Sequence, residues 1–117
     1  GAFGQTVSWP TQGYPGLKEL AEVFKTRGYD TLPTYAIVGY AILQVIEQAV
    51  QGAQTTDQEK LKDYIYKSAF KTAAGDIRFQ DDGTPVYSQI FIQYINGKNE
   101  VVWPKQHQTA QPVLRMP

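Results

Sequence analysis

The segment that most constrains the fold is residues 35–50, which predict one long helix of about four turns. Pro33 ends the preceding loop, and Thr34 is a candidate N-cap. The first half of the helix is apolar on all sides, so it has to be buried on several sides. A free-standing domain of 117 residues has little interior with which to provide that burial. The stretch is also too short and too polar to cross a bilayer, so we expect no membrane-spanning helix.

Two shorter helices are predicted on either side of this one. In the earlier helix the apolar residues recur at i, i+3, i+4 and i+7, which places them on one face: Leu17, Leu20, Ala21 and Phe24. Gly28 suits its C-terminal cap, because glycine adopts left-handed dihedral angles without a Cβ clash. The later helix opens with a capping box, in which Thr56 is the expected N-cap and Glu59 the reciprocal partner.

Extended structure is predicted before and after the helices. Residues 6–10 form a short β-prone segment that Pro10 stops. From Gly75 onward, apolar residues alternate with polar ones, and the Asp-Asp-Gly sequence at 81–83 predicts a turn.

A β-hairpin is predicted near the C-terminus. Residues 86–95 are rich in β-branched and aromatic side chains, the Asn-Gly-Lys sequence at 96–98 predicts a turn, and residues 100–103 form the return strand. The segment 105–117 predicts irregular chain on the surface. Helices followed by strands would, on pattern alone, indicate an α+β domain.

Composition and charge exclude several classes of protein. Hydrophobic residues make up 42% and charged residues 19% of the chain, which is typical of a globular protein. Eleven basic residues balance eleven acidic ones, so the electrostatic signature of a nucleic-acid-binding protein is missing. The absence of cysteine excludes disulfides and thiolate zinc sites, and it is compatible with any redox compartment.

Catalytic and metal-binding patterns are also missing from the sequence. The only histidine, His107, lies in the polar tail without a nucleophile motif nearby, which favours a solvated residue over a general base. Asp81 and Asp82 precede a glycine and are typical turn formers, and no calcium-loop spacing follows them. We therefore expect no enzyme, no cofactor and no metal. A self-contained α+β enzyme stays a third, disfavoured hypothesis.

The aromatic residues are the best candidates for ligand contacts, because such rings combine apolar faces with a polar tip. Tyr35 stands out, since it begins the long helix where side chains and free N–H groups can face a crevice. Ordinary packing is the alternative role for this ring.

Several segments occur in a characteristic order: Thr-Tyr-Ala at 34–36 with Gly-Tyr-Ala at 39–41, the segment 75–83, and residues 94–98 followed by Val-Val-Trp-Pro at 101–104. Taken together, they resemble the branched-chain amino acid type of ABC-transporter solute-binding protein. The resemblance covers nearly the whole chain and is carried by the order and spacing of these motifs. It places the chain in the C-terminal third of such a protein.

The resemblance implies an α/β chain that is a C-terminal fragment of the two-lobed type 1 periplasmic-binding-protein fold. Residues 1–10 would be a crossover strand, residues 11–74 the helical part of the N-terminal lobe, and residues 75–117 a crossover strand, the β-hairpin and the tail on the C-terminal lobe. Lobe elements outside the chain would then cover the helix at 35–50.

The resemblance further implies a non-enzymatic protein of the periplasm, or one that is extracellular and lipid-anchored in a Gram-positive organism. It would hold an amino acid, an amide or an aromatic acid between two lobes and deliver it to an ABC-transporter permease. Tyr35 matches an aromatic position that contacts the ligand side chain, and Trp9 lies beside the crossover, so both are predicted to bind ligand. Most ligand anchors would lie outside the chain. Further expected partners are the rest of its own protein or a second copy. A ligand-sensing regulatory or receptor domain of the same fold is the alternative.

Overall fold

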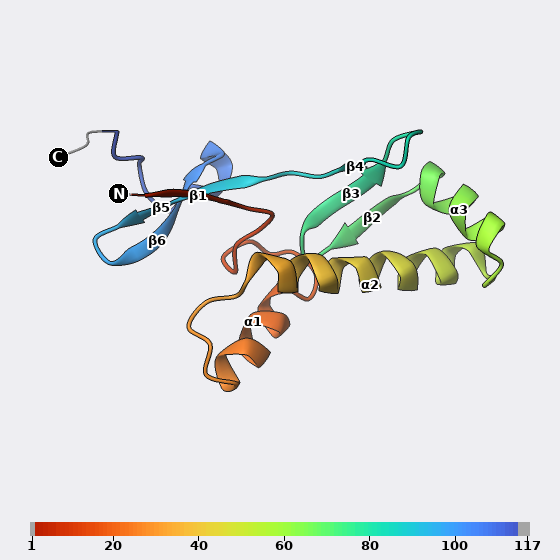
Figure 1. Cartoon of the computed structure of the whole chain (residues 1–117), viewed down its shortest axis with the longest axis horizontal. Helices are drawn as coiled ribbons and strands as arrows, with labels where there is room; N and C mark the ends of the chain where they lie inside the picture. Colours follow the sequence, from red (N-terminus) through yellow and green to blue (C-terminus); the bar gives the residue numbers. More distant parts are fainter. Residues whose placement is uncertain (1, 115–117) are drawn as a thin grey trace.

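The computed structural model describes residues 2–114 and shows a mixed α/β chain (Figure 1). The helices in that range are α1 (Leu17–Thr26), α2 (Thr34–Ala53), α3 (Gln58–Lys67) and the short 3-10 helix η1 (Lys105–His107). The strands are β1 (Phe3–Thr6), β2 (Ala69–Thr72), β3 (Gly75–Phe79), β4 (Pro85–Val86), β5 (Ile90–Ile95) and β6 (Lys98–Trp103).

The described strands form two antiparallel sheets, ordered β1-β5-β6 and β2-β3-β4. We call β1, β5, β6 and η1 the hairpin half, and the helices α1–α3 with β2–β4 the helical half. Figure 1 shows the two halves following one another along the long axis. The chain extends 56 × 33 × 19 Å with a radius of gyration of 16.5 Å, whereas a compact domain of this length has about 13 Å. The halves therefore share little interior.

Helix α1 matches the prediction, including its C-terminal cap. Gly28 has a φ of 85°, and its N–H donates to the Lys25 carbonyl at 3.0 Å. The Tyr29 N–H donates to the Phe24 carbonyl at 3.1 Å, which completes a Schellman motif. Glycine is needed at this position because the cap requires a left-handed residue.

Helix α2 confirms the long helix, but the predicted N-cap is wrong. Pro33 occupies the cap position without a side-chain hydrogen bond, and Thr34 is the first helical residue. The Thr34 hydroxyl instead lies 2.8 Å from the hydroxyl of Thr6. The Thr34 hydroxyl therefore bonds to Thr6, which precedes α1 in the chain, and does not accept from a backbone N–H of its own helix. The helix ends at Gln54, which has a φ of 52°.

Helix α3 begins one residue later than the capping box predicted. Asp57 is the N-cap, and its carboxylate accepts from the Lys60 N–H at 3.0 Å, so the assignment of Thr56 was wrong. Both residue types cap helices, but an ionised carboxylate makes the stronger, charge-assisted bond.

The first strand lies earlier than predicted. It is β1, Phe3–Thr6, which pairs with β5, and the segment 6–10 is not a strand. Beyond β1 the chain turns, with the Gln12 N–H donating to the Trp9 carbonyl at 2.9 Å. The bounds of β1 are set by its pairing with β5, which lies far along the chain and which local sequence pattern cannot predict.

The later strands confirm the extended segment after Gly75 and the hairpin, with two differences. Strand β2 was not predicted, and it lies inside the range 11–74, for which the prediction was the helical part of one lobe. The segment 86–95 is interrupted because β4 pairs with β3 in one sheet while β5 pairs with β6 in the other. Asn96 and Gly97, with φ of 49° and 82°, make the predicted turn.

Over residues 108–114 the tail is irregular, as predicted, but it is held in place; the rest of the predicted segment, residues 115–117, lies outside the described residues. Gln93 in β5 is 1% exposed, and its carboxamide both accepts from the Val113 N–H and donates to the Val113 carbonyl, each at 2.9 Å. The Thr109 hydroxyl accepts from the Val101 N–H at 2.8 Å. The tail therefore belongs to the hairpin half.

The buried residues of α2 pack against the hairpin β2–β3 and α1. Two clusters result, and they share this one helix: Ile37 and Ala41 with Leu17, Ala73, Ala74 and Ile77, and Val45 and Ala49 with Phe70. One face of α2 is thus the main core of the helical half.

Candidate ligand-binding surface

Tyr35 lies in the first turn of α2 and is 89% exposed. The neighbouring Thr34 touches Thr6 at the end of β1, so this turn lies where the helical half meets the hairpin half (Figure 1). The ring is therefore not part of the core. It is free to contact a ligand or another part of a longer protein.

Trp9 lies shortly after Thr6, on the segment between β1 and α1, and is half-buried. It lines a cavity of about 310 Å³ together with residues of α1 and of the loop that follows it, among them Lys25, Tyr29 and Leu32. Tyr35 does not line this cavity. The contact between Thr6 and Thr34 joins the segments that carry the two predicted rings, but the rings do not share one pocket.

The outer face of α2 is apolar and exposed. Ile42 is 55% and Leu43 65% exposed, and Ile46 is half exposed. Val38, Ile42 and Ile46 also line a groove of about 400 Å³ whose opposite wall is Ile77, Phe79 and Tyr87. The chain therefore buries one face of this helix but leaves part of its apolar surface exposed, as the apolar pattern on several sides predicted.

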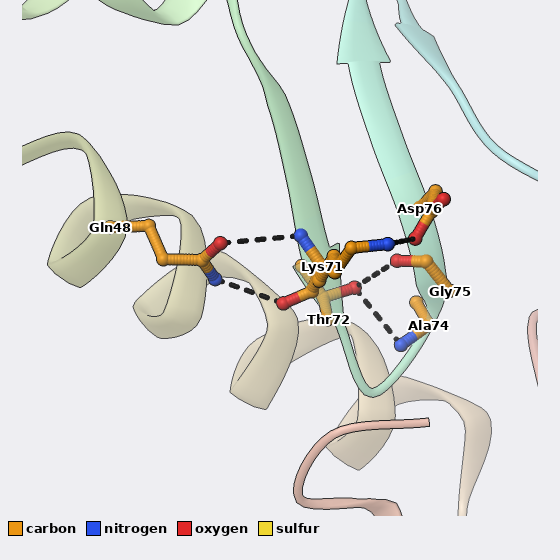
Figure 2. A network of polar contacts seen from close by, with 6 residues as sticks. All are labelled: Gln48, Lys71, Thr72, Ala74, Gly75 and Asp76. Atoms are coloured by element: carbon orange, nitrogen blue, oxygen red, sulfur yellow. Dashed lines mark hydrogen bonds and ion pairs between the residues drawn. The ribbon is translucent and has the colours of Figure 1, made fainter. Parts of the chain in front are cut away.

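Two glutamines on α2 fix the hairpin β2–β3 to the helix. Gln48 accepts from the Lys71 N–H at 3.2 Å and donates to the Lys71 carbonyl at 2.9 Å, so its carboxamide occupies the outer edge of β2 (Figure 2). Gln44 accepts from the Ala73 N–H at 2.7 Å and donates to the Pro15 carbonyl at 2.9 Å. Local sequence pattern does not predict these bonds, because all three partners lie more than 20 residues away in the chain.

The β2–β3 turn is closed by its own side chains. The Thr72 hydroxyl donates to the Gly75 carbonyl at 2.8 Å and accepts from the Ala74 N–H at 3.1 Å (Figure 2). The exposed pair Lys71–Asp76, at 3.5 Å, adds little, because solvent screens such ion pairs. The turn is therefore a fixed point of the helical half.

Within residues 2–114, the pKa values of two side chains, Tyr14 and Asp82, are shifted from their ordinary values. Burial raises the pKa of the Tyr14 hydroxyl, and the nearby Asp76 carboxylate raises it further. Hydrogen bonding to Thr84 lowers the pKa of the Asp82 carboxyl, whose oxygen accepts from the Thr84 N–H at 2.8 Å. Tyr14 thus stays neutral at physiological pH, and Asp82 acts as the turn residue that the sequence predicted.

His107 contacts an aromatic ring of the segment that precedes α1. His107 packs edge-on against Tyr14, with ring centroids 6.3 Å apart. Among the described residues, no group of three or more potential ligands could hold a metal ion. Between residues 2 and 114, no helix is long and apolar enough to cross a membrane.

Comparison with solved structures defines the class of fold. A leucine binding protein LivK from Thermotoga maritima superposes with a TM-score of 0.68 at 23% identity, covering 86% of this chain and 29% of that one. An ABC-type branched-chain amino acid transporter from Rhodopseudomonas palustris gives a TM-score of 0.68 at 20% identity with the same coverage. The mixed α/β arrangement is that of part of a type 1 periplasmic-binding protein.

Curated relatives narrow the resemblance. The Leu/Ile/Val-binding protein homolog 1 of Brucella abortus (strain 2308) is 34% identical over 68 residues, which are 57% of this chain and 18% of that protein. The protein of the same name from Brucella suis biovar 1 (strain 1330) is 33% identical over 72 residues, 61% of this chain and 19% of that protein. No family model matches the chain. The predicted resemblance to the branched-chain amino acid type of solute-binding protein is confirmed, and the chain spans less than a fifth of these relatives.

Proposed function

We propose that this chain is part of the solute-binding component of an ABC importer. The intact protein would bind a branched-chain amino acid, or a related small carboxylate or amide, between two lobes outside the cytoplasmic membrane and deliver it to the permease. It would have no catalytic activity of its own. The observation that supports this most strongly is the similarity to Leu/Ile/Val-binding proteins, with a matching fold over most of the chain.

The division of the chain follows from the same proposal. The helical half would belong to one lobe and the hairpin half to the other, and the segments that join them would be crossovers. Tyr35 and Trp9 lie on the segments that the Thr6–Thr34 contact joins, which is where a cleft between two lobes would open. We propose that Tyr35 forms part of the ligand wall and that Trp9 makes a weaker contribution.

Substitution of Tyr35 tests this role in an intact protein that carries the chain. Tyr35→Ala should weaken binding of leucine, isoleucine or valine by about 1–3 kcal/mol, the scale of a lost buried aromatic contact. Isothermal titration calorimetry measures this directly. Tyr94→Ala is the matched control, since Tyr94 is also an exposed tyrosine but belongs to the hairpin half. Equal affinity of Tyr35→Ala and the unaltered protein would remove Tyr35 from the site.

The exposed apolar face of α2 supports a second part of the proposal, that the rest of a longer protein covers it. The isolated chain should therefore associate with itself, because apolar patches of this kind rarely stay exposed. When the rest of the longer protein is supplied, the chain should associate with it instead. Light scattering measures the mass of the isolated chain in solution. A monodisperse, thermally stable monomer would contradict this part of the proposal.

A further inference from the structure

Two kinds of side-chain contact hold the hairpin half and the helical half together: contacts beside one covalent connection between them, and a contact far from that connection. Near the end of β1, the Thr6 hydroxyl meets Thr34, and the fully buried Ser8 donates to the Ala73 carbonyl at 2.7 Å. These contacts lie next to the covalent connection that leaves β1. A second connection between the halves, residues 87–89, joins β4 to β5. Because the Thr6 and Ser8 contacts lie at a connection, they can persist while the halves rotate, so they mark a pivot but do not fix the angle between the halves.

The contact between Tyr14 and His107 is of the other kind, because its two rings belong to different halves. Their centroids lie 6.3 Å apart with planes at 71°, an edge-to-face arrangement. The two residues are far apart in sequence, and neither adjoins β1. Such a contact exists at one relative orientation of the halves and is lost when they rotate.

Tyr14 is firmly held on the helical half. Its ring lies against Gly75 in the β2–β3 turn, where an added Cβ would meet ring carbons at 3.3 Å. Its hydroxyl lies 3.3 Å from the Gln12 side-chain nitrogen, and the Gln12 oxygen in turn accepts from the Trp9 N–H at 2.8 Å. The ring therefore moves with the β2–β3 turn.

His107 is held equally well on the hairpin half. It ends η1, and its N–H donates to the Pro104 carbonyl at 3.0 Å. The residues that follow are bonded to β6, with the Gln108 side chain donating to the Val102 carbonyl at 2.7 Å. The imidazole therefore moves with the β-hairpin.

We propose that the Tyr14–His107 ring pair is a latch that selects one orientation of the two halves about the pivot at Thr6–Ser8. The latch follows from the contacts alone and does not depend on the identity of any ligand. Its loss should raise the population of other orientations by roughly 2- to 12-fold, the weight of one aromatic pair.

Distance measurements on the chain itself test the latch. The sequence has no cysteine, so Lys60→Cys in α3 and Lys98→Cys in the hairpin give one spin label on each half. Double electron–electron resonance measures the distribution of distances between the two labels. Diluting labelled chain in unlabelled chain removes distances between different molecules. We expect His107→Ala to broaden it, His107→Phe to restore it, and the exposed neighbour Gln106→Ala to leave it unchanged.

A second variant keeps the test decisive if His107→Ala disturbs the tail. Tyr14→Leu removes the same pair from the other side and should broaden the distribution equally, and the double variant should broaden it no further. A distribution that stays as narrow in His107→Ala and in Tyr14→Leu as in the unaltered chain would overturn the proposal. So would a further broadening in the double variant, because independent effects would then explain each change.

Discussion

Two glycines in α2 predict opposite effects of the same substitution. An added Cβ at Gly52 would overlap the hydroxyl and ring of Tyr64 on α3, whereas an added Cβ at Gly39 would meet nothing within 4 Å. Both residues have ordinary helical dihedral angles, so backbone strain does not separate them. Gly39 lies well inside α2 and Gly52 lies in its last turn, so Gly39→Ala and Gly52→Ala differ mainly in what the new methyl group touches.

The expected magnitudes follow from two terms. Replacing glycine by alanine inside a helix stabilises it by about 0.8–1 kcal/mol, and Gly39→Ala should show most of that gain. At Gly52 the methyl group has to displace Tyr64, whose ring packs edge-on against the buried Phe70 with centroids 6.5 Å apart. Overpacking of this kind costs about 1–3 kcal/mol. The two variants should thus differ in unfolding free energy by about 2 kcal/mol, with Gly52→Ala the less stable.

Urea unfolding followed by circular dichroism measures this difference at a chain concentration low enough to limit association. The midpoint should rise for Gly39→Ala and fall for Gly52→Ala at similar slopes. Combining Gly52→Ala with Tyr64→Leu should recover part of the loss, because the smaller side chain vacates the space. An equal rise of the midpoint in both single variants would refute the reasoning, since helix propensity alone would then account for the data.

Three further predictions concern the tail, a turn and the exposed face. Gln93→Met removes both hydrogen bonds to Val113 and should cost about 1–3 kcal/mol of stability in urea unfolding, with faster hydrogen exchange at the Val113 amide. Because the folded-state pKa of Asp82 is lowered, its contribution is present above the unfolded pKa and is lost as pH falls through the folded one. Asp82→Asn should therefore destabilise the chain at neutral pH. In titrations the difference should begin to shrink below about pH 4, the unfolded pKa, and should vanish only below the lowered folded-state pKa. Leu43→Lys should reduce the self-association measured by light scattering without lowering helix content. Unchanged association would show that the exposed apolar face of α2 does not mediate self-association.

The sequence predicted the helices better than their caps, for a physical reason. Helical periodicity is a property of many residues, so α1, α2 and α3 were all recognisable. A cap depends on one side chain, and that side chain can bond elsewhere. Thr34 bonded to Thr6 across 28 residues, and Asp57 took the role expected of Thr56.

Long-range hydrogen bonds explain most of what the sequence did not predict. Strand β2 is only four residues long, and Gln48 of α2 covers its outer edge. Gln44 and Gln93 likewise use both ends of the carboxamide as a substitute for a neighbouring main chain. Glutamine is unremarkable in a local pattern, so its partners become visible only when the chain is folded.

At the candidate site, too, the sequence pattern predicted the helix and its apolar surface, but not which residues would contact it. The apolar residues of α2 predicted a helix with more buried faces than this chain can supply, and the exposed Ile42 and Leu43 confirm it. That exposure is informative because the opposite face, at Ile37 and Ala41, is packed as a normal core. One side of the helix is therefore buried and the other is exposed, which is what we expect if the proposed longer, two-lobed protein covers the exposed side. Tyr35 lies at the end of this helix, beside the junction of the halves, and for that reason it is a better candidate for a ligand contact than for a core residue.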